Sequence, residues 1–368
     1  MTQPLLDELR GLAESFATRE ARDPDAFPAE NVADVKRSGL LLAPLPPALG
    51  GRGSDLVDLV RATEIIARAS ASTALLVTMP LGLAGVYGSG PETAPEEHRA
   101  SWSTQVEEVA ASYHAGAWYA ACNSEKGAGG SLASTKTVAE RDEDGAFRLT
   151  GEKILASSGR FSDYFFSTAK VQPEQMPGCG VVEFFFVKTS APGVQIMSDW
   201  DGFGMRSTES HTVRFDRAIA EGIMGFPNFI DLVKPLQYWF CLFAAIPLGC
   251  ASATLDALAT PAPQSPALRL RFIDARMRIE AMRAYLLETA GQWRPRAPAE
   301  YQARVLRTKT YVTQEATKIC AELFALGGGR HYRRSDPLAR ALADSFAGTA
   351  LRPPLPLALD SLFEQSGL

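Results

Sequence analysis

A glycine-rich loop, residues 122–131 (CNSEKGAGGS), is the segment whose residue types best suit ligand binding. Small side chains and glycines let backbone N–H groups approach the edge of a planar ring closely. The alternative is a tight turn that binds nothing. The loop is not a dinucleotide fingerprint, because Gly127-x-Gly129 lacks a third glycine at the required offset. The sequence contains no P-loop either.

A second glycine run, Gly327–Gly329, is followed by Arg330, His331, Arg333 and Arg334. Backbone N–H groups and arginines together suit an anion such as phosphate. The alternative is a solvated basic surface, and we favour the anion. His331 could transfer a proton near neutral pH, although an ordinary surface histidine is the more common case.

Three further side chains are weaker candidates. Arg206 stands before a predicted strand and could contact an anionic substrate or form a surface ion pair, with equal weight. His211 is predicted to be structural, and His114 is a weak candidate on the substrate side. The five cysteines form no C-x-x-C pair, and we expect no metal site.

The composition restricts the class of protein. The 368 residues include 46% hydrophobic and 21% charged side chains, which is typical of a soluble globular chain large enough for several sub-structures. A net charge of −5 leaves no basic footprint for nucleic acid. Unpaired cysteines and an acidic start that is not typical of a signal peptide favour a cytoplasmic protein.

The order of elements is helical, then β, then helical again, which favours an α+β fold with segregated layers. The charge-free residues 235–255 are predicted to form a buried core helix, with a membrane span as the less favoured alternative. Their apolar character also suggests oligomerisation through the C-terminal helices. Helices are predicted at 5–12, 31–42, 55–71 (with Ser54 as N-cap), 72–87, 95–108, 229–258, 267–293, 299–326 and 337–346, and strands at 135–140, 146–150, 164–170, 181–188, 194–197 and 212–215.

These segments, in this order, resemble the acyl-CoA dehydrogenase superfamily over essentially the whole chain. Residues 122–131 look like the family's T-E-P-x-A-G-S-D signature, with Ser124 at the threonine and Lys126 at the proline. Residues 151–153 resemble its glycine-x-lysine. Weaker matches are the P-x-x-x-G-G turn at 45–51, the G-x-R-x-T/S-x-S segment at 204–210 and the Y-G-G-x-G loop at 326–329.

The resemblance implies an N-terminal helical domain (residues 1–115), a middle domain built as a small β-barrel or sandwich (116–224) and a C-terminal four-helix bundle (225–368). It also implies a flavin cofactor, FAD or alternatively FMN, with Arg206 near the substrate. The residues implied at the cofactor are Asn123, Ser124, Gly129, Gly130, Leu155, Ser157, Gly328, Gly329 and Thr349.

The chain departs from the family where the reaction needs a base. Acyl-CoA dehydrogenation requires a carboxylate that removes the α-proton of the substrate. The family's E-G-T segment reads Ala347-Gly348-Thr349 here, so Ala347 occupies the base position. The other position used in the family falls near Trp239, with no carboxylate within a turn. We therefore expect little conventional dehydrogenase activity, with His331 or Glu64 as weak substitutes.

Two other departures concern the cofactor and the tail. The family's R-x-x-F-G segment has no match between Thr260 and Arg276, where residues 261–266 shorten the connection. FAD could therefore bind differently or be replaced by FMN. Residues 336–340 resemble the P-L-x-R element of the monooxygenase-like branch, but residues 351–354 stand where that branch carries a histidine.

Three functions stay open at this point. The first is a flavin-dependent oxidoreductase that acts on an acyl-CoA or a similar acyl thioester, with an electron-transfer flavoprotein as acceptor. The second is a flavin-dependent monooxygenase or oxidase that receives reduced flavin from a flavin reductase and uses O2. The third is a catalytically silent homologue that binds a flavin or another ligand. The resemblance implies a homodimer or homotetramer, and we expect no nucleic-acid or membrane partner.

Overall fold

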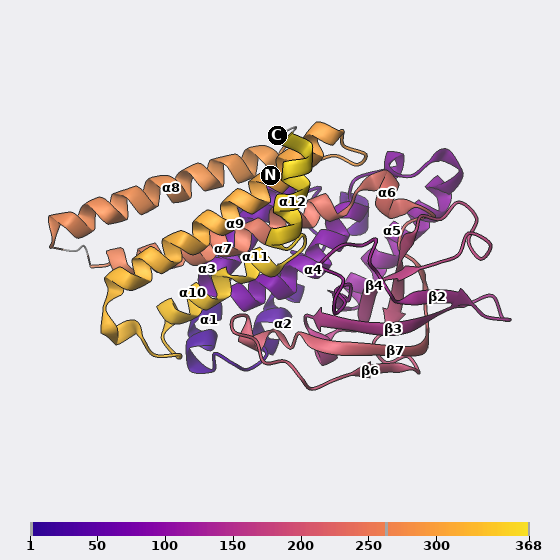
Figure 1. The fold of residues 1–368 in the computed structure, drawn as a ribbon, viewed down its shortest axis with the longest axis horizontal. Coiled ribbons are helices and arrows are strands. Elements are labelled where there is room, and N and C mark those ends of the chain that lie inside the picture. Colours follow the sequence, from indigo (N-terminus) through magenta and orange to yellow (C-terminus); the bar gives the residue numbers. More distant parts are fainter. Residues whose placement is uncertain (1–2, 262–263, 367–368) are drawn as a thin grey trace.

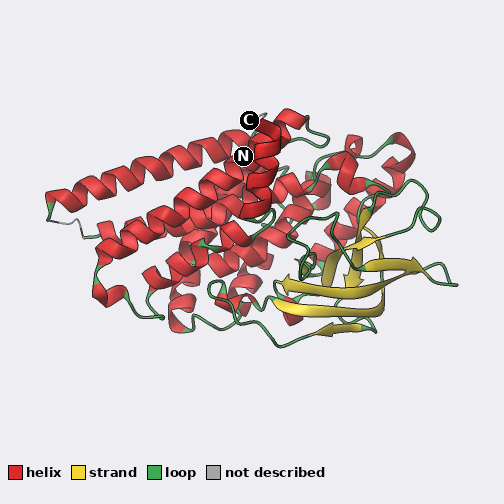
Figure 2. Ribbon diagram, viewed as in Figure 1, coloured by secondary structure: helices red, strands yellow, loops and turns green. Residues whose placement is uncertain are grey.

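The computed structural model describes residues 3–261 and 264–366. Long helices fill one end of the molecule and a β-sheet fills the other (Figures 1 and 2). The helices are α1 (Gln3–Arg22), α2 (Ala29–Ser38), α3 (Leu56–Ala69), α4 (Ala71–Tyr87), α5 (Arg99–His114), α6 (Phe229–Val233), α7 (Leu236–Ala259), α8 (Pro266–Ala290), α9 (Ala299–Gly327), α10 (Pro337–Ser345), α11 (Ala347–Ala350) and α12 (Leu355–Ser366).

The strands are joined in one mixed sheet with the order β6-β7-β3-β2-β4-β5-β8, and β1 pairs with β4. Most neighbours are antiparallel, but β4 runs parallel to both β1 and β2. Buried aromatic and β-branched side chains give the sheet a hydrophobic cluster of its own. The strands are β1 (Tyr119–Ala121), β2 (Val138–Arg141), β3 (Phe147–Ala156), β4 (Tyr164–Lys170), β5 (Val182–Lys188), β6 (Val194–Ile196), β7 (His211–Ile219) and β8 (Gly222–Ile223).

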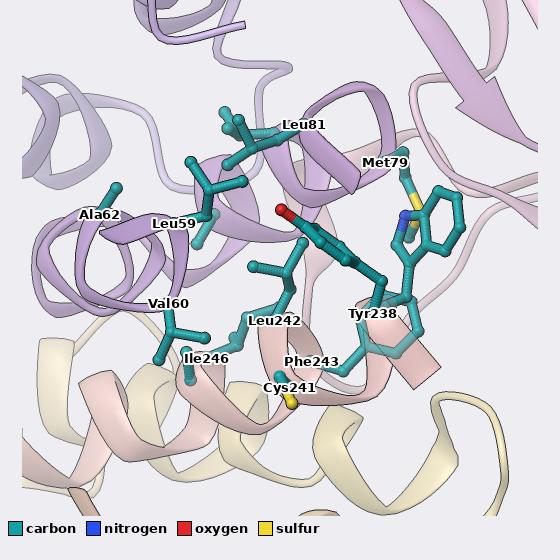
Figure 3. Packing of buried hydrophobic residues seen from close by; sticks show 14 of the residues in the cluster. Leu59, Val60, Ala62, Met79, Leu81, Tyr238, Cys241, Leu242, Phe243 and Ile246 are labelled. Atoms are coloured by element: carbon teal, nitrogen blue, oxygen red, sulfur yellow. The ribbon is translucent and has the colours of Figure 1, made fainter. Parts of the chain in front are cut away.

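Helix α7 is the centre of the larger hydrophobic core. It packs against α3, α4, α8, α9 and α10. Figure 3 shows Ile246 and Leu242 facing Val60 and Leu59 of α3, with Tyr238 directed between α3 and α4. Residues that are apolar all round a helix need partners on every side, and α7 has them within this chain.

The predicted α+β arrangement of helices, strands and helices is confirmed, and several details differ. Asp55, not Ser54, caps α3, since its side chain accepts a hydrogen bond from the Asp58 backbone N–H. The helix predicted over 229–258 is two helices, because Lys234 adopts a left-handed conformation (φ 55°) before Pro235. The predicted barrel or sandwich takes the form of one mixed sheet, and β1 and β8 were not predicted.

The charge-free segment forms the buried core helix that its composition predicted. By length and composition, α7 could cross a membrane, but most of it is buried inside the chain. Its apolar surface is covered by neighbouring helices, so it gives no support to oligomerisation. Part of the shortened connection before α8, residues 262 and 263, lies outside the described residues.

Candidate functional site

A cavity of about 280 Å³ lies between the sheet and the helices. Its size is near the lower end for a site that encloses a small molecule. One wall comes from the sheet and its loops, and the other comes from the helices. The lining residues are Leu75, Met79, Ala121, Asn123, Ser124, Leu155, Ser157, Phe166, Trp200, Phe203, Gly204, Met205, Ser210, Leu236, Trp239, Phe240, Phe243, Ala343, Phe346, Ala347, Ala350, Leu351 and Arg352.

The sheet wall begins with the glycine-rich loop, which is anchored by a buried ion pair. Lys153 of β3 is fully buried, and its Nζ lies 2.6 Å from Oε1 of Glu125. Glu125 also accepts hydrogen bonds from the backbone N–H groups of Lys136 and Thr137. Asn123 accepts a hydrogen bond from the Thr168 backbone N–H, at 3.0 Å. The loop is therefore fixed to β3, to β4 and to the residues that precede β2.

Burial and ion pairing together shift the pKa of both partners. Burial lowers the pKa of Lys153 below its ordinary range, although the Glu125 carboxylate opposes that shift. Burial raises the pKa of Glu125, but hydrogen bonds from Lys153 and Thr137 outweigh it and leave this pKa below its usual value. Each charge is retained because the other is present.

Strand β3 ends in an irregular segment that presents Leu155 and Ser157 to the cavity. Its register against β7 shifts between Lys153 and Ala156. Leu155 has φ 60° and leaves 49% of its surface exposed. A left-handed leucine is rare, and such strained residues are often found at functional sites. This irregularity is the local feature that opens the sheet wall.

A short chain of hydroxyl groups also lies on the sheet wall. The Oγ atoms of Ser157 and Ser210 are 2.9 Å apart, and the Ser210 Oγ is 2.6 Å from the Thr208 Oγ1. Thr208 donates to the Met205 carbonyl oxygen. Ser157 and Ser210 both line the cavity, so this hydroxyl pair belongs to its polar surface.

The helical wall is apolar and contains both positions at which a base was considered. Ala347 of α11 and Trp239 of α7 line the same cavity. Trp239 fits because Gly82 of α4 has no side chain, and a Cβ there would lie 2.3 Å from its indole nitrogen. Within residues 3–261 and 264–366, no carboxylate lines this cavity. The arrangement has no group that could take a proton as a carboxylate does.

An aromatic rim closes the cavity toward solvent. Phe203 is 74% exposed, and its ring packs edge-on against Phe346 with the centroids 6.0 Å apart. His211 accepts hydrogen bonds from the backbone N–H groups of Asp199 and Trp200, which fixes this loop, and the Trp200 indole donates to the carbonyl oxygens of Met205 and Arg206. His211 is thus structural, as predicted.

The rim is also tied to α10 through a buried carboxylate. Asp344 accepts a 2.6 Å hydrogen bond from the Met205 backbone N–H, and burial raises its pKa to about 6. Asp344 follows the lining residue Ala343 but is not itself part of the cavity surface.

The C-terminal tail completes the cavity where Leu351 and Arg352 line it. Arg352 donates hydrogen bonds to the carbonyl oxygens of Gly130 (2.9 Å) and Asn123 (2.8 Å). Lys309 of α9 donates to the carbonyl oxygens of Leu351 and Pro353, both at 2.8 Å. The tail therefore contacts the glycine-rich loop directly.

Some of the predicted site residues meet at this cavity and others lie elsewhere. Asn123, Ser124, Leu155 and Ser157 line it together with Ala347. The remaining residues are not among its lining residues, and their roles stay predictions. These are Gly129 and Gly130, which belong to the same loop, Gly328 and Gly329, which precede His331, and Thr349, which donates to the Phe346 carbonyl oxygen.

The charged candidates are engaged away from the cavity. Arg206 forms an ion pair with Asp25 (Nε–Oδ1 2.6 Å), and Arg334 binds the same carboxylate. His331 contacts Asp336 at 3.1 Å. Glu64 is bound by Arg283 at 2.6 Å.

His114 is also removed from the cavity, since its Nε2 lies 3.0 Å from the Leu49 carbonyl oxygen. Sequence reasoning gave no site role to Trp200, Phe203, Ser210 or Arg352. The only signal for the first two was a Trp-x-x-Phe-Gly run in a loop, and the place of Arg352 depends on how the tail folds back.

Comparisons with known proteins agree with this arrangement. The family models for the N-terminal, middle and C-terminal domains of acyl-CoA dehydrogenase match residues 3–104, 120–218 and 241–351. An acyl-CoA dehydrogenase of Bacillus subtilis (strain 168) is 23% identical over 92% of this chain and 91% of its own length. A dibenzothiophene monooxygenase of Rhodococcus qingshengii is 29% identical over 67% of this chain and 60% of its own length.

Among solved structures, KijD3 in complex with FMN and a dTDP-linked amino-keto sugar superimposes with a TM-score of 0.86. It is 23% identical, and the match covers 99% of this chain and 93% of that one. At this identity the likeness shows a shared fold.

Proposed function

The chain belongs to the acyl-CoA dehydrogenase superfamily, and from this premise we propose that it is a flavin-dependent monooxygenase or oxidase. The observation that carries the proposal is the helical wall of the cavity. Ala347 and Trp239, the two positions that the family resemblance implies for a dehydrogenase base, both line this wall, and no carboxylate among the described residues lines the cavity. An oxygenation reaction needs no carboxylate for an α-proton.

The cavity suits the isoalloxazine ring of a flavin. One wall offers hydroxyl groups and the Asn123–Ser124 backbone, and the other offers aromatic and aliphatic surface. This distribution fits a planar ring with one polar edge. We propose that Asn123, Ser124, Leu155 and Ser157 hold the ring, in FMN or in FAD. The FMN in the KijD3 complex supports the smaller cofactor.

Reduced flavin would supply two electrons to O2, so that one oxygen atom enters the substrate and the other leaves as water. The chain's own contribution is to orient the ring and exclude water. Trp200, Phe203 and Phe346 shield the mouth of the cavity, and the Ser157–Ser210 pair offers hydrogen bonds inside it. A separate flavin reductase would be the partner that provides the reduced cofactor.

The second candidate is a dehydrogenase of acyl-CoA or a similar thioester, with an electron-transfer flavoprotein as acceptor. The near full-length similarity to the acyl-CoA dehydrogenase of Bacillus subtilis supports it. It would require a base from outside the cavity lining, so we rank it below oxygenation.

We also propose a homodimer or homotetramer in the cytoplasm. The support comes from α8, not from the segment that first suggested it. Leu270, Ile273 and Met277 follow one another at helical spacing and are 69%, 54% and 58% exposed. An exposed apolar row of this kind marks a contact surface.

The test begins with the visible spectrum of the purified protein, with and without added FMN or FAD. Flavin-loaded protein is then mixed anaerobically with a panel of acyl-CoA esters, and separately with reduced flavin, O2 and a panel of aromatic and amino-sugar compounds. Oxygen-dependent product formation without bleaching by acyl-CoA is the expected result. Bleaching by an acyl-CoA would replace the proposal with the dehydrogenase, and absence of flavin binding would favour a silent homologue.

A further inference from the structure

We propose that the C-terminal tail is a latch on the flavin-binding loop, and that Lys309 and Arg352 are the positioning residues that close it. Here "latch" means residues 351–354 with the side chains of Arg352 and Lys309. The ligand is a flavin only if the proposed function holds, but the latch itself is argued from contacts within the chain.

The first step is the contact between the tail and the loop. The Arg352 guanidinium bonds the carbonyl oxygens of Asn123 and Gly130, which stand near the two ends of the glycine-rich loop. Pro354 lies close to Gly130, because a Cβ added at that glycine would be 2.3 Å from the proline ring. One side chain therefore joins both ends of the loop to the tail.

The second step is the attachment of the tail to the helices. The Lys309 ammonium bonds the carbonyl oxygens of Leu351 and Pro353, the residues on either side of Arg352. Lys309 is only 2% exposed. Among the described residues it has no carboxylate within ion-pair distance. Burial lowers the pKa of Lys309 to about 7, so keeping its charge there is unfavourable, and this lysine is hard to explain as a source of stability alone.

The third step concerns charge. Arg352 is the one charged side chain among the described residues that line the cavity. Its hydrogen bonds go to carbonyl oxygens, and its Nε is buried without a partner in the part of the chain that the structure describes. Burial lowers its pKa, with only a partial opposing effect from Glu125. Opening the latch would remove this group from the cavity wall and release the loop in the same movement.

A latch of this kind has a consequence for cofactor exchange. The latch contributes Leu351 and Arg352 to the cavity lining, so a ring bound there would be covered on this side while the latch is docked. A protein that receives reduced flavin from another enzyme must let the cofactor in and out. We infer that the docked tail sets the rate at which flavin leaves.

The test compares flavin release and tail mobility in matched variants of the full chain. FMN and FAD affinity and dissociation rate are measured by fluorescence for Arg352→Met, Arg352→Lys and Lys309→Met. Arg283→Met is the control, since Arg283 is a partly buried arginine that binds Glu64 and lines no part of the cavity. Hydrogen exchange of residues 123–130, and of the backbone N–H groups of Leu351 and Arg352 in the tail, is followed in the same proteins without flavin.

We expect Arg352→Met and Lys309→Met to bind flavin roughly ten- to a hundredfold more weakly, as loss of charge-assisted hydrogen bonds implies. Exchange should rise in the loop and in the tail together, and Arg352→Lys should recover part of both effects. The control should lose stability without either change. Unaltered affinity, or faster exchange in the tail while the loop stays protected, would overturn the latch.

The two proposals can fail separately. If the wild-type protein binds neither FMN nor FAD, the proposed function is wrong, and the exchange measurements still decide whether the tail holds the loop. If it binds flavin and all variants release it at the wild-type rate, the latch is wrong and the proposed function stands.

Discussion

The two walls of the cavity present different kinds of side chain. The sheet wall carries hydroxyl groups and a loop that is fixed by the buried Lys153–Glu125 pair. The helical wall carries Trp239, Phe243 and Ala347, with no carboxylate among the described lining residues. Both walls are well packed, so they differ in the chemistry of the side chains that they present and not in how well ordered they are.

This difference separates the groups proposed to bind the flavin from the position implied for a catalytic base. The sheet wall presents hydroxyl groups and the Asn123–Ser124 segment to the cavity, as the proposed flavin site requires. The helical wall presents Ala347 and Trp239, the two positions that the family resemblance implies for a base, and no carboxylate among the described residues lines the cavity. A binding site can persist while the reaction changes, because function depends on the groups placed in a fold.

The first prediction concerns a carboxylate introduced on the helical wall, which would remove the chemical difference between the two walls. Ala347→Glu should raise α,β-dehydrogenation of an acyl-CoA roughly 10²–10⁴-fold over a near-silent parent, the usual contribution of a positioned base. Bleaching of bound flavin by acyl-CoA esters, with an artificial acceptor for turnover, measures it. Ala347→Gln has the same shape without a basic oxygen and should stay inactive. Wild-type turnover at ordinary dehydrogenase rates would show that the base lies elsewhere.

The second prediction concerns the buried ion pair that holds the sheet wall. Lys153→Met should cost about 3–5 kcal/mol of unfolding free energy, because it leaves the Glu125 carboxylate buried without its partner. Urea denaturation measures the loss. The double variant Glu125→Gln with Lys153→Met removes both charges and keeps an acceptor for Thr137, so it should recover part of the stability. A single variant that loses less than the double one would contradict this account.

Sequence reasoning pointed to the loop 122–131 and to Ala347, and residues of both line the cavity. The small residues of the loop and the segment Ala347-Gly348-Thr349 are visible without a structure, and the family resemblance gave them their predicted roles. The buried role of residues 235–255 followed from composition alone.

The tail was not predicted, and the reason is physical. Lys309 lies in the polar run Thr308-Lys309-Thr310, which gives no sign of burial, and it is enclosed only because the tail folds back over α9. Arg352 and Ser210 become part of the site through contacts between segments far apart in the chain. Such contacts leave no periodic pattern in the sequence.

The third prediction concerns how the unfolding free energy depends on pH, which should differ between groups behind the helical wall and groups behind the sheet wall. Glu20 and Asp344 lie with Arg340 behind the helical wall, and burial raises their pKa values to about 7 and about 6. Between about pH 4 and 7 the unfolded chain has lost these protons while the folded chain keeps them, so stability should fall as pH rises.

The fall should be on the order of 1–3 kcal/mol, and Glu20→Gln should flatten it between about pH 4.5 and 7. Thermal unfolding across that range is the measurement. The charge-paired support of the sheet wall, with a lowered pKa for Glu125, should give no such trend there. Stability that rises through this range in both wild type and Glu20→Gln would contradict the assignment.

The last prediction concerns the hydroxyl chain, where the expected effect is smallest. Ser210→Ala should cost about 1 kcal/mol, the net value of a typical hydrogen bond, because it removes the partner of both Ser157 and Thr208. Thr104→Ala is the control, since that hydroxyl is exposed and bonds only its own helix. A cycle of Ser157→Ala, Ser210→Ala and the double variant isolates their coupling.

A positive coupling in stability, together with a shifted absorption band of bound flavin in each single variant, would show that the pair acts as one polar group beside the ring. Independent effects and an unchanged spectrum would mean that the hydroxyl groups only hold the rim loop through Met205. In that case the polarity of the sheet wall at the ring would come from the backbone of Asn123 and Ser124, and the contrast between the two walls would rest on the loop alone.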